Sequence, residues 1–305
     1  MADGRFAPSP TGRLHVGNLR TALLSWLFAR VDGGRFLVRV EDLDPVASRD
    51  ELVAEHLDDL AALGLDHDGP VLRQSAPEAR ARHESALAQL DADGLLYPCF
   101  CTRREVAEAA QAAHGPFPEG AYPGTCRDLT EAERRERAAR RPDRQPSLRV
   151  RADEAVVAVV DRLHGERAGV VDDFVVRRGD GVPAYNLAVV VDDAFQGIAE
   201  VVRGDDLLDG TPRQAWLCDR LGLPRPAWVH VPLVLGPDGE RLAKRHGSVT
   251  RAELADRGVD APALLGWMGA SLGLAAPGER VGAATLLGRF DPDAVPTGPA
   301  VFDPA

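Results

Sequence analysis

Short apolar runs alternate with stretches of helical periodicity along the first third of the chain. Apolar residues recur every three or four positions over residues 19–31, and residues 35–40 show the apolar alternation of a strand. Residues 49–65 and 76–93 return to helical spacing, with charged outer faces. This succession of strands and helices favours an α/β fold.

The same patterns return in the second half of the chain. Residues 147–175 are rich in β-branched side chains, and residues 183–193 form a nearly continuous apolar run that fits either a helix or a strand. Residues 200–214 predict a strand, a polar turn and the start of a helix. A further strand is expected at 229–235 and helical structure at 252–274.

These elements suggest one nucleotide-binding sheet that is interrupted by an insertion. The expected parts are residues 1–95 as the first half of the nucleotide-binding domain, 96–175 as the insertion, 176–235 as the second half, and 236–305 as a loop followed by a small helical tail.

The composition is that of a soluble globular protein, with 305 residues of which 45% are hydrophobic and 27% charged. The stretch Met1-Ala2-Asp3-Gly4 does not resemble a signal peptide, and no apolar run approaches the roughly 18 residues that span a bilayer. We therefore expect a cytoplasmic protein that makes no membrane contact.

The net charge of −11 argues against a general nucleic-acid coat, because nucleic-acid backbones are attracted to basic surfaces. A nucleic-acid partner would need a local basic patch. Residues 127–151 contain nine arginines against five acidic residues and are the candidate. A solvated helix around residues 131–141 explains the same charges equally well.

The loop before the first long helix carries candidate chemistry. Residues 5–20 run from a short extended entry, through two prolines and Gly12, into that helix. Such a junction directs backbone N–H groups and the positive end of the helix dipole at one point, as in many phosphate sites. His15 lies just ahead of the helix, and Gly17 removes a side chain where a ligand could lie. A histidine here is otherwise a common cap or surface residue.

One lysine stands out among the basic residues. Of the 36 lysines and arginines, 35 are arginine and only Lys244 is lysine. A lysine kept among so many arginines suggests a task that a broad guanidinium cannot perform, such as placing a point charge on a phosphate. Chance, or a solvated loop position, is the simpler explanation.

Three of the four cysteines lie close together in the sequence, at Cys99, Cys101 and Cys126. Thiolates in this number favour zinc, and a closed tetrahedral site needs a fourth ligand. From spacing alone, His114, Glu119 and Tyr122 are all candidates for that ligand. The alternative is a set of buried, reduced cysteines, which is the interpretation we give to Cys218 in an amphipathic helix.

Two motifs carry a family resemblance. The segment His15-Val16-Gly17-Asn18 resembles the "HIGH" signature of class I aminoacyl-tRNA synthetases in the form used by glutamyl-type enzymes, with Asn18 in place of the final histidine. Residues 236–247 resemble their "KMSKS" loop, in which Lys244 matches the second lysine, while Arg241 and Ala243 replace the first lysine and the serine. The resemblance covers nearly the whole chain and is strongest to the glutamyl-queuosine tRNA(Asp) synthetase family.

The resemblance implies a Rossmann-type doubly wound parallel sheet with a zinc-bearing insertion and a small helical C-terminal part. It also implies the site residues. His15, Gly17, Asn18 and Lys244 would bind ATP with its Mg²⁺ and stabilise the charge that develops on the phosphates. The glutamate pocket would comprise Arg5, Phe6, Ala7, Pro8, Ser9, Glu41, Tyr185 and Arg203, and the zinc ligands would be Cys99, Cys101, Tyr122 and Cys126.

The charges of the implied pocket suit its substrate. Glutamate brings two carboxylates and an ammonium, and Arg5, Arg203 and Glu41 supply the opposite charges. Two simpler interpretations remain open: Glu41 belongs to an acidic loop before the next helix, and Arg203 forms structural salt bridges with Asp205 and Asp206.

The activity implied by the resemblance is ATP-dependent activation of L-glutamate, followed by its transfer to the queuosine base of tRNA(Asp) by a monomeric enzyme. Only 61 residues follow Lys244, so no anticodon-binding domain is expected. Two alternatives remain: a minimal glutamyl-tRNA synthetase that charges the tRNA 3′ end, and a catalytically silent RNA-binding relative.

Overall fold

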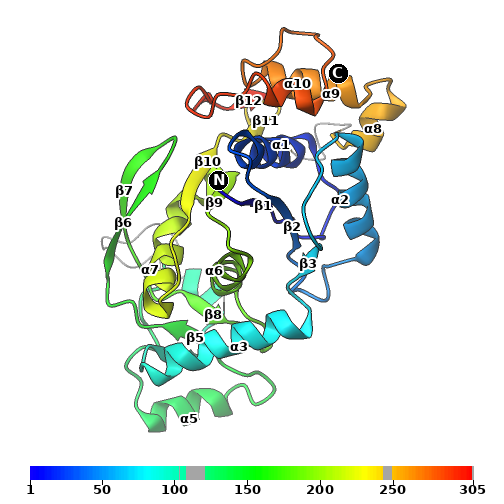
Figure 1. Cartoon of the computed structure of the whole chain (residues 1–305). Helices are drawn as coiled ribbons and strands as arrows, with labels where there is room; N and C mark the ends of the chain where they lie inside the picture. Colours follow the sequence, from blue (N-terminus) through cyan, green and yellow to red (C-terminus); the bar gives the residue numbers. More distant parts are fainter. Residues whose placement is uncertain (103, 108–120, 243–248, 304–305) are drawn as a thin grey trace.

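The computed structural model describes residues 1–102, 104–107, 121–242 and 249–303. Its centre is a parallel sheet built from two parts (Figure 1). β1 (Gly4–Phe6), β2 (Phe36–Val40) and β3 (Leu72–Arg73) form the first part. β9 (Glu200–Gly204) and β10 (Ala227–Val231) form the core of the second.

The two parts join at β1 and β9. The backbone N–H groups of Ala199 and Glu200 donate to the carbonyl oxygen of Asp3 at 2.9 and 3.2 Å. The strands therefore lie side by side in the order β3-β2-β1-β9-β10, with β1 and β9 at the middle (Figure 1). Strand order reverses at this point, where doubly wound sheets bind their ligands.

Alternate residues of these strands pack into different hydrophobic cores. Phe36 and Val38 of β2 join a core around α1 (Val16–Val31), whereas Leu37 joins the core around α6 (Tyr185–Gln196) and α7 (Thr211–Leu221). Val202 and Val201 of β9 divide in the same way. Successive strand residues face opposite sides of a sheet, so one core covers each face.

The helices on each face are assigned by these cores. α1 packs with α2 (Asp50–Ala62) on one face. α3 (Pro77–Ala92), α6 (Tyr185–Gln196) and α7 (Thr211–Leu221) pack together on the other. The apolar run 183–193 fitted either a helix or a strand, and in the structure its residues from Tyr185 onward belong to α6. Gly197, at φ +69°, ends this helix in a left-handed turn.

The segment between the two halves forms its own small sheet and a hairpin. β4 (Leu96–Cys99), β5 (Ser147–Val150) and β8 (Val175–Arg177) are antiparallel, and α5 (Glu131–Ala139) lies between β4 and β5 in sequence. β6 (Val156–Asp161) and β7 (Gly165–Val170) form the hairpin.

The hairpin is attached to the main sheet. β6 pairs in parallel with β10 through Asp161 and Trp228, and the antiparallel β7 then forms the edge of the extended sheet. The segment 96–175 is thus joined to the second half of the sheet, and the domain boundaries remain our proposal.

The C-terminal part packs on α1. It contains β11 (Val234–Leu235), α8 (Arg251–Asp256), α9 (Ala261–Ala270), α10 (Ala283–Leu287) and β12 (Ala300–Val301), which pairs with β11. The predicted helical stretch 252–274 is two helices, because Gly258 at φ +86° turns the chain between them. Among the helices of the described ranges, none is long and apolar enough to cross a bilayer.

Candidate active site

A cavity of about 430 Å³ opens where the two halves of the sheet meet. Its lining contains the predicted glutamate- and ATP-binding residues of the described chain: Arg5, Phe6, Ala7, Pro8, Ser9, His15, Gly17, Asn18, Glu41, Tyr185 and Arg203. Lys244 and Ala243 lie outside the described residues, shortly after Arg241, which also lines the cavity. Residues from both halves of the sequence, 5–41 and 185–241, thus form one concave surface.

Arg5 lies in β1 at the base of this cavity. Its guanidinium is buried, donating from Nε to Asp193 Oδ1 at 3.2 Å and from Nη1 to the carbonyl oxygen of Val202 at 3.3 Å. Both partners belong to the second half of the sheet or its helix α6. The cation is therefore held across the junction of the halves.

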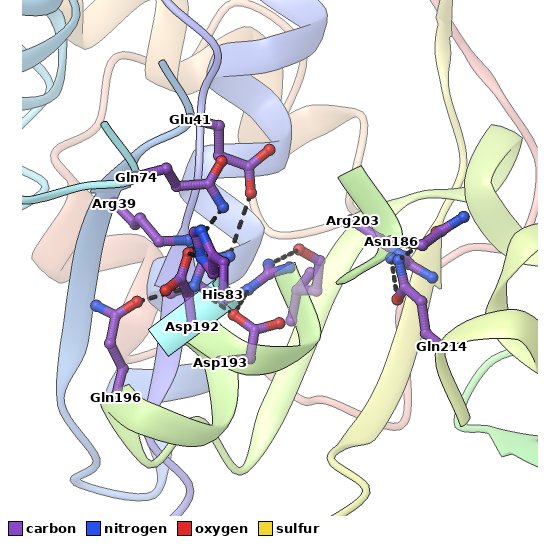
Figure 2. A network of polar contacts seen from close by, with 12 residues as sticks. Arg39, Glu41, Gln74, His83, Asn186, Asp192, Asp193, Gln196, Arg203 and Gln214 are labelled. Carbon is purple, nitrogen blue, oxygen red and sulfur yellow. Dashed lines mark hydrogen bonds and ion pairs between the residues drawn. The ribbon is translucent and has the colours of Figure 1, made fainter. Parts of the chain in front are cut away.

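Asp193 joins Arg5 to a second buried arginine, Arg39. Figure 2 shows Arg39 with Asp193, Gln196 and Glu41. Arg39 donates from Nη1 to Asp193 at 2.6 Å and to Gln196 at 2.8 Å, and from Nη2 to Glu41 at 3.2 Å. Arg39 is 1% exposed. The result is a chain of alternating charges, Arg5–Asp193–Arg39–Glu41, that ends at the cavity wall.

The pKa values in this chain follow from burial and charge. Burial raises the pKa of Glu41, although the Arg39 and Arg5 guanidiniums oppose the rise. Burial also opposes ionisation of Asp193, but Arg39 and Arg5 outweigh it and hold the pKa of that carboxyl below its usual range. Asp193 is thus the structural counterion of two arginines, while a cation placed beside Glu41 would stabilise its charged form.

Arg203 lies in β9 and is held by neutral acceptors. It donates from Nη1 to Gln214 Oε1 at 2.8 Å, from Nη2 to Thr211 Oγ1 at 2.9 Å, and from Nε to His230 Nε2 at 2.9 Å. Figure 2 shows it with Gln214 and Asn186, to which the Gln214 amide donates at 3.2 Å.

The salt bridges considered for Arg203 are absent from the described part of the chain. Asp206 instead pairs with Arg241 at 2.7 Å, and no carboxylate among the described residues forms an ion pair with Arg203. Burial, together with the Arg5 cation, lowers the pKa of Arg203, and the neighbouring Tyr185 opposes this. Its charge is therefore available to an anion entering the cavity.

His15 caps the helix that begins at Val16. Its Nδ1 accepts hydrogen bonds from the backbone N–H groups of Gly17 at 3.1 Å and Asn18 at 3.3 Å, while the Asn18 side chain accepts from the backbone N–H of His15 at 3.1 Å. Burial, reinforced by the Arg241 cation, lowers the pKa of His15. The ring is therefore neutral at pH 7, with its proton on Nε2.

This cap occupies backbone N–H groups that the sequence analysis expected to be free for a phosphate. The N–H groups of Gly17 and Asn18 already have a partner in His15, so the donors left to a ligand are His15 Nε2 and the Asn18 side-chain amide. The space at Gly17 is occupied by the same imidazole, because a Cβ there would lie 2.9 Å from Cε1 of His15.

Gly17→Ala is therefore expected to displace the His15 ring. A Cβ contact under 3.0 Å forces the imidazole out of its capping position, and we expect about a hundredfold loss in the rate of glutamate-dependent ATP–pyrophosphate exchange. Gly12→Ala is the matched control, since nothing lies within 4 Å of a Cβ at Gly12 in the same loop. Equal activity of the two variants would show that the position of the ring does not matter.

A second cavity, of about 860 Å³, adjoins the first. Ser9, Glu41 and Tyr185 line both, and the second extends to Arg149 and Arg178 on β5 and just after β8. Tyr185 is 43% exposed and is therefore a residue of the cavity wall rather than of the hydrophobic core. The two cavities therefore share part of their walls, between β1 and the small antiparallel sheet.

Three cysteines lie together beside this small sheet. The Sγ atoms of Cys99, Cys101 and Cys126 are all within 4.8 Å of one another and can hold a metal ion. Tyr122 Oη lies 3.5 Å from Cys99 Sγ and 3.9 Å from Cys101 Sγ. Hydrogen bonds from Cys101 and Cys126 lower the pKa of the Cys99 thiol, which favours a thiolate. The donor set fits a soft metal, while the candidates His114 and Glu119 lie outside the described residues.

The arginine-rich segment is largely occupied by local ion pairs. Arg140 pairs with Glu136 at 2.6 Å and Arg141 with Glu105 at 2.8 Å on the exposed helix α5 and its continuation. Arg127 binds the buried Asp173 at 2.5 Å. These contacts fit the solvated-helix interpretation and reduce the charge that this segment offers to a nucleic acid.

The sequence analysis missed several residues behind the cavity wall. Arg39, Asp193, Asp161 and His230 were not chosen as site residues, yet all four are buried and bonded to residues of the lining or to each other. A usable signal was present: charged or titratable residues inside strongly apolar runs need a buried partner. The partner itself cannot be found from such a pattern.

Comparisons with known proteins agree with the fold and the site. Residues 2–278 match the catalytic-domain model of the class I tRNA synthetases for E and Q. A crystal structure of a glutamate tRNA ligase from Elizabethkingia meningosepticum, in complex with its amino acid, has a TM-score of 0.82 at 25% identity and covers 99% of this chain and 67% of that one.

Two curated relatives narrow the family further. A protein of Nocardia farcinica named glutamyl-Q tRNA(Asp) synthetase is 56% identical over 299 residues, which cover 98% of this chain and 92% of the relative. Glutamate–tRNA ligase 1 of Halorhodospira halophila is 42% identical over 311 residues, which cover 98% of this chain but 65% of the relative. The chain is therefore a ligase of the class I glutamyl- and glutaminyl-tRNA synthetase family and belongs to its glutamyl-Q tRNA(Asp) synthetase group.

Proposed function

We propose that this enzyme activates L-glutamate with ATP and transfers the glutamyl group to the queuosine base of tRNA(Asp). The observation that carries the proposal is the set of charges in the 430 Å³ cavity, where Arg5, Arg203 and Glu41 meet the phosphate-type loop of His15. The name of the Nocardia farcinica relative supports the choice of acceptor.

The cavity charges complement glutamate. Its two carboxylates each require a cation, and Arg5 and Arg203 are fixed at neighbouring strands of the sheet. The ammonium requires an anion, and Glu41 lines the same space. Tyr185 adds a hydroxyl between the two cavities. Because these side chains are held by buried partners, the substrate meets a preorganised site and little reorganisation is needed.

In the first step, a carboxylate oxygen of glutamate attacks the α-phosphorus of ATP. The bond from this phosphorus to the bridging oxygen breaks, giving glutamyl-adenylate and pyrophosphate. No protein nucleophile is required, so the residues act by positioning and by stabilising charge. His15 Nε2–H and the Asn18 amide are the donors for the phosphates, and Lys244 adds a cation by resemblance. Mg²⁺ would accompany ATP as its counterion.

In the second step, a hydroxyl of the queuosine base attacks the glutamyl carbonyl carbon. The bond to the adenylate oxygen breaks, AMP leaves, and the hydroxyl proton is released. The 860 Å³ cavity gives an acceptor a route to this carbon, because Ser9, Glu41 and Tyr185 line both spaces. Arg149 and Arg178 line the acceptor side, where they would contact the nucleotide.

The decisive experiment is transfer of labelled glutamate to tRNA(Asp) purified from cells with and without queuosine. We expect ATP-dependent labelling of the queuosine-containing tRNA alone, and no labelling when ATP is omitted. Digestion of the labelled tRNA with ribonuclease A, which frees the 3′-terminal adenosine from the rest of the chain, distinguishes a base ester from a 3′ ester by showing whether the label lies on the fragment that carries queuosine or on that adenosine. Glutamate activation without labelling of queuosine-containing tRNA(Asp) would contradict the acceptor assignment.

The second candidate function is charging of the 3′ end of a glutamate tRNA. It is favoured by the 42% identity to glutamate–tRNA ligase 1 of Halorhodospira halophila. Labelling of glutamate tRNA in the same assay would establish it. A silent RNA-binding relative is disfavoured by the charges in the cavity and would be revived by the absence of any glutamate-dependent pyrophosphate exchange.

We further propose that Cys99, Cys101, Cys126 and Tyr122 hold a structural zinc ion. The phenol lies at 3.5 Å from one thiol and 3.9 Å from a second, which provides the fourth donor. Bound zinc would tie β4 to the segment around Cys126 and so stabilise the wall of the second cavity. Its role is structural, since four protein ligands leave no open position for chemistry.

Cys126→Ser is expected to remove this zinc. Metal analysis of the purified protein should fall from about one zinc per chain to almost none, and the unfolding temperature should fall because metal binding contributes folding free energy. Cys218→Ala is the control, because Cys218 is a buried free thiol of α7 outside the cluster. If both variants retain zinc, the ligand assignment is wrong.

A further inference from the structure

Two buried titratable residues lie behind Arg203, on the side away from the cavity. His230 of β10 is 0% exposed and Asp161 at the end of β6 is 1% exposed. The His230 Nδ1 atom lies 2.6 Å from Asp161 Oδ2, and its Nε2 atom lies 2.9 Å from Arg203 Nε. Three adjacent strands thus contribute one line of hydrogen bonds that runs from the β6–β7 hairpin to the cavity wall.

The chemistry of arginine decides the tautomer of His230. Arginine Nε always carries a hydrogen, so the Nε2 atom that faces it must be an acceptor. The imidazole proton is therefore on Nδ1, where it is donated to Asp161. Thr211 Oγ1 lies 3.2 Å from the same Nε2 atom and accepts a hydrogen bond from Arg203 Nη2. A proton on Nε2 would place two donors against each other.

Asp161 is itself held rigidly. Its Oδ2 atom also accepts from the backbone N–H of His230 at 3.0 Å, and its Oδ1 atom accepts from the backbone N–H groups of Leu163 and His164, both at 3.0 Å. Four N–H donors therefore point at one carboxylate. An amide in its place would direct its NH₂ group at two of these donors, whichever way it were rotated.

We propose that Asp161 and His230 are positioning residues that hold the Arg203 guanidinium in the orientation that binds a carboxylate of glutamate. The proposal rests on the proposed function, since it takes Arg203 as a substrate contact. Asp161 fixes the tautomer of His230, and His230 fixes Nε of Arg203, while Gln214 and Thr211 hold its two Nη atoms. Three of the five N–H groups of Arg203 are used in this way, and the side chain presents the rest to the cavity that it lines.

The proposal carries a pH dependence with a defined sign. The charged or titratable groups facing His230 are Asp161 and His164 from the hairpin and Arg203 from β9. Burial lowers the pKa of His230, as do Arg203 and His164, and Asp161 opposes them. His230 is therefore neutral above pH 6.5, and only at lower pH does protonation turn Nε2 into a donor that repels Arg203. Glutamate affinity should fall at acid pH.

The test measures KM for glutamate and kcat in ATP–pyrophosphate exchange. We expect Asp161→Asn to raise KM by about 10- to 100-fold, with a smaller change in kcat. His230→Gln should raise KM less, because its side-chain oxygen can still accept from Arg203. It should also remove the His230 part of the rise in KM below pH 6.5 and leave any part due to Glu41, whose pKa is raised by burial.

His83→Gln is the matched control. His83 and Asp192 form an equally buried histidine–aspartate pair, with 3.0 Å between Nε2 and Oδ2 and exposures of 0% and 2%, but neither is bonded to Arg203 (Figure 2). If loss of a buried histidine–aspartate pair were enough to raise KM, His83→Gln and His230→Gln would both show the rise. We expect instead that His83→Gln has the wild-type KM for glutamate and the wild-type dependence of KM on acid pH. Thermal unfolding of each variant confirms that it is folded.

A spectroscopic readout separates this proposal from the proposed function. Nitrogen-15 NMR of the wild-type imidazoles should show one deeply buried ring protonated on Nδ1, and this signal should disappear in His230→Gln. A His230 protonated on Nε2 would overturn the inference even in an active enzyme. So would KM values for both variants within twofold of the wild type. A wild type without any pyrophosphate exchange overturns the proposed function instead, while the NMR result still decides the geometry.

Discussion

Arg203→Met is expected to reduce kcat/KM for glutamate by about a thousandfold in ATP–pyrophosphate exchange. A factor of one thousand corresponds to about 4 kcal/mol, within the range for removing one partner of a buried charge pair. The unfolding temperature should change little, because the hydrogen-bond partners of Arg203 are neutral. Gln214 retains its bond to Asn186, and Thr211 can donate to His230 Nε2 at 3.2 Å.

Calorimetric titration with glutamate and thermal unfolding would check both parts of this prediction. Arg135→Met is the matched control, because Arg135 is an exposed arginine of α5 whose contact with Glu131 is at 3.9 Å. The two variants lose the same charge and gain the same side chain. Near-normal glutamate affinity in Arg203→Met would show that Arg203 does not bind glutamate, even though it lines the cavity.

Asp193→Asn is expected to have the largest effect on stability. Its Oδ1 atom is shared by Arg5 at 3.2 Å and Arg39 at 2.6 Å, so loss of the charge leaves two buried guanidiniums without their common counterion. Breaking a buried ion pair in this way costs about 3–5 kcal/mol of unfolding free energy. Glutamate activation should fall as well, because Arg5 loses the partner that orients it.

Denaturant unfolding at several pH values would test the origin of this effect. Arg39 and Arg5 hold the pKa of Asp193 below the ordinary value of 3.8 despite its burial, so the wild type carries the stabilisation above pH 3.8. The difference in unfolding free energy between the wild type and Asp193→Asn should be constant near neutral pH. It should shrink only as the pH falls through the lowered pKa of Asp193. Asp58→Asn is the control, because Asp58 lies at an exposed position of α2. If Asp193→Asn lowers the unfolding free energy as little as Asp58→Asn does, Asp193 is not a counterion shared by two arginines.

In our proposal, substrate affinity and fold stability depend on different residues. Arg203 is held by neutral groups that have other partners, so in this proposal its charge contributes to substrate binding. Asp193 is held by two arginines that have few alternative anions, so its charge contributes to the stability of the folded state. Arg5 and Glu41 belong to both sets, since each lines the cavity and each is bonded to the chain of buried charges.

Much of the site could be predicted from the sequence because its key residues lie at the ends of predictable elements. Arg5 and Glu41 lie in or just after short apolar strands, and His15 precedes a helix with strong periodicity. The spacing of Cys99, Cys101 and Cys126 indicated a thiol cluster, and the Sγ atoms do lie together. The role of Lys244 remains a prediction from the sequence, since the residue lies outside the described part of the chain.

Local patterns were less informative where tertiary packing decides. The run 183–193 fitted a helix or a strand because nearly every residue is apolar, and a buried helix and a buried strand then look alike. The structure has a helix there, with its first residue, Tyr185, facing the cavities. Similarly, the loop before α1 was expected to leave free N–H groups, but the His15 side chain binds two of them.

From the sequence alone we could name the residue types of the candidate site: arginines, a carboxylate and a histidine at element ends, three thiols at metal-site spacing, and one lysine among 36 basic residues. The charge states and orientations of these groups depend on their tertiary contacts. The reason is distance along the chain, since Arg5 meets Asp193 across 188 positions and His230 meets Asp161 across 69. No local pattern specifies such partners, because they come together only when the strands pair and the helices pack.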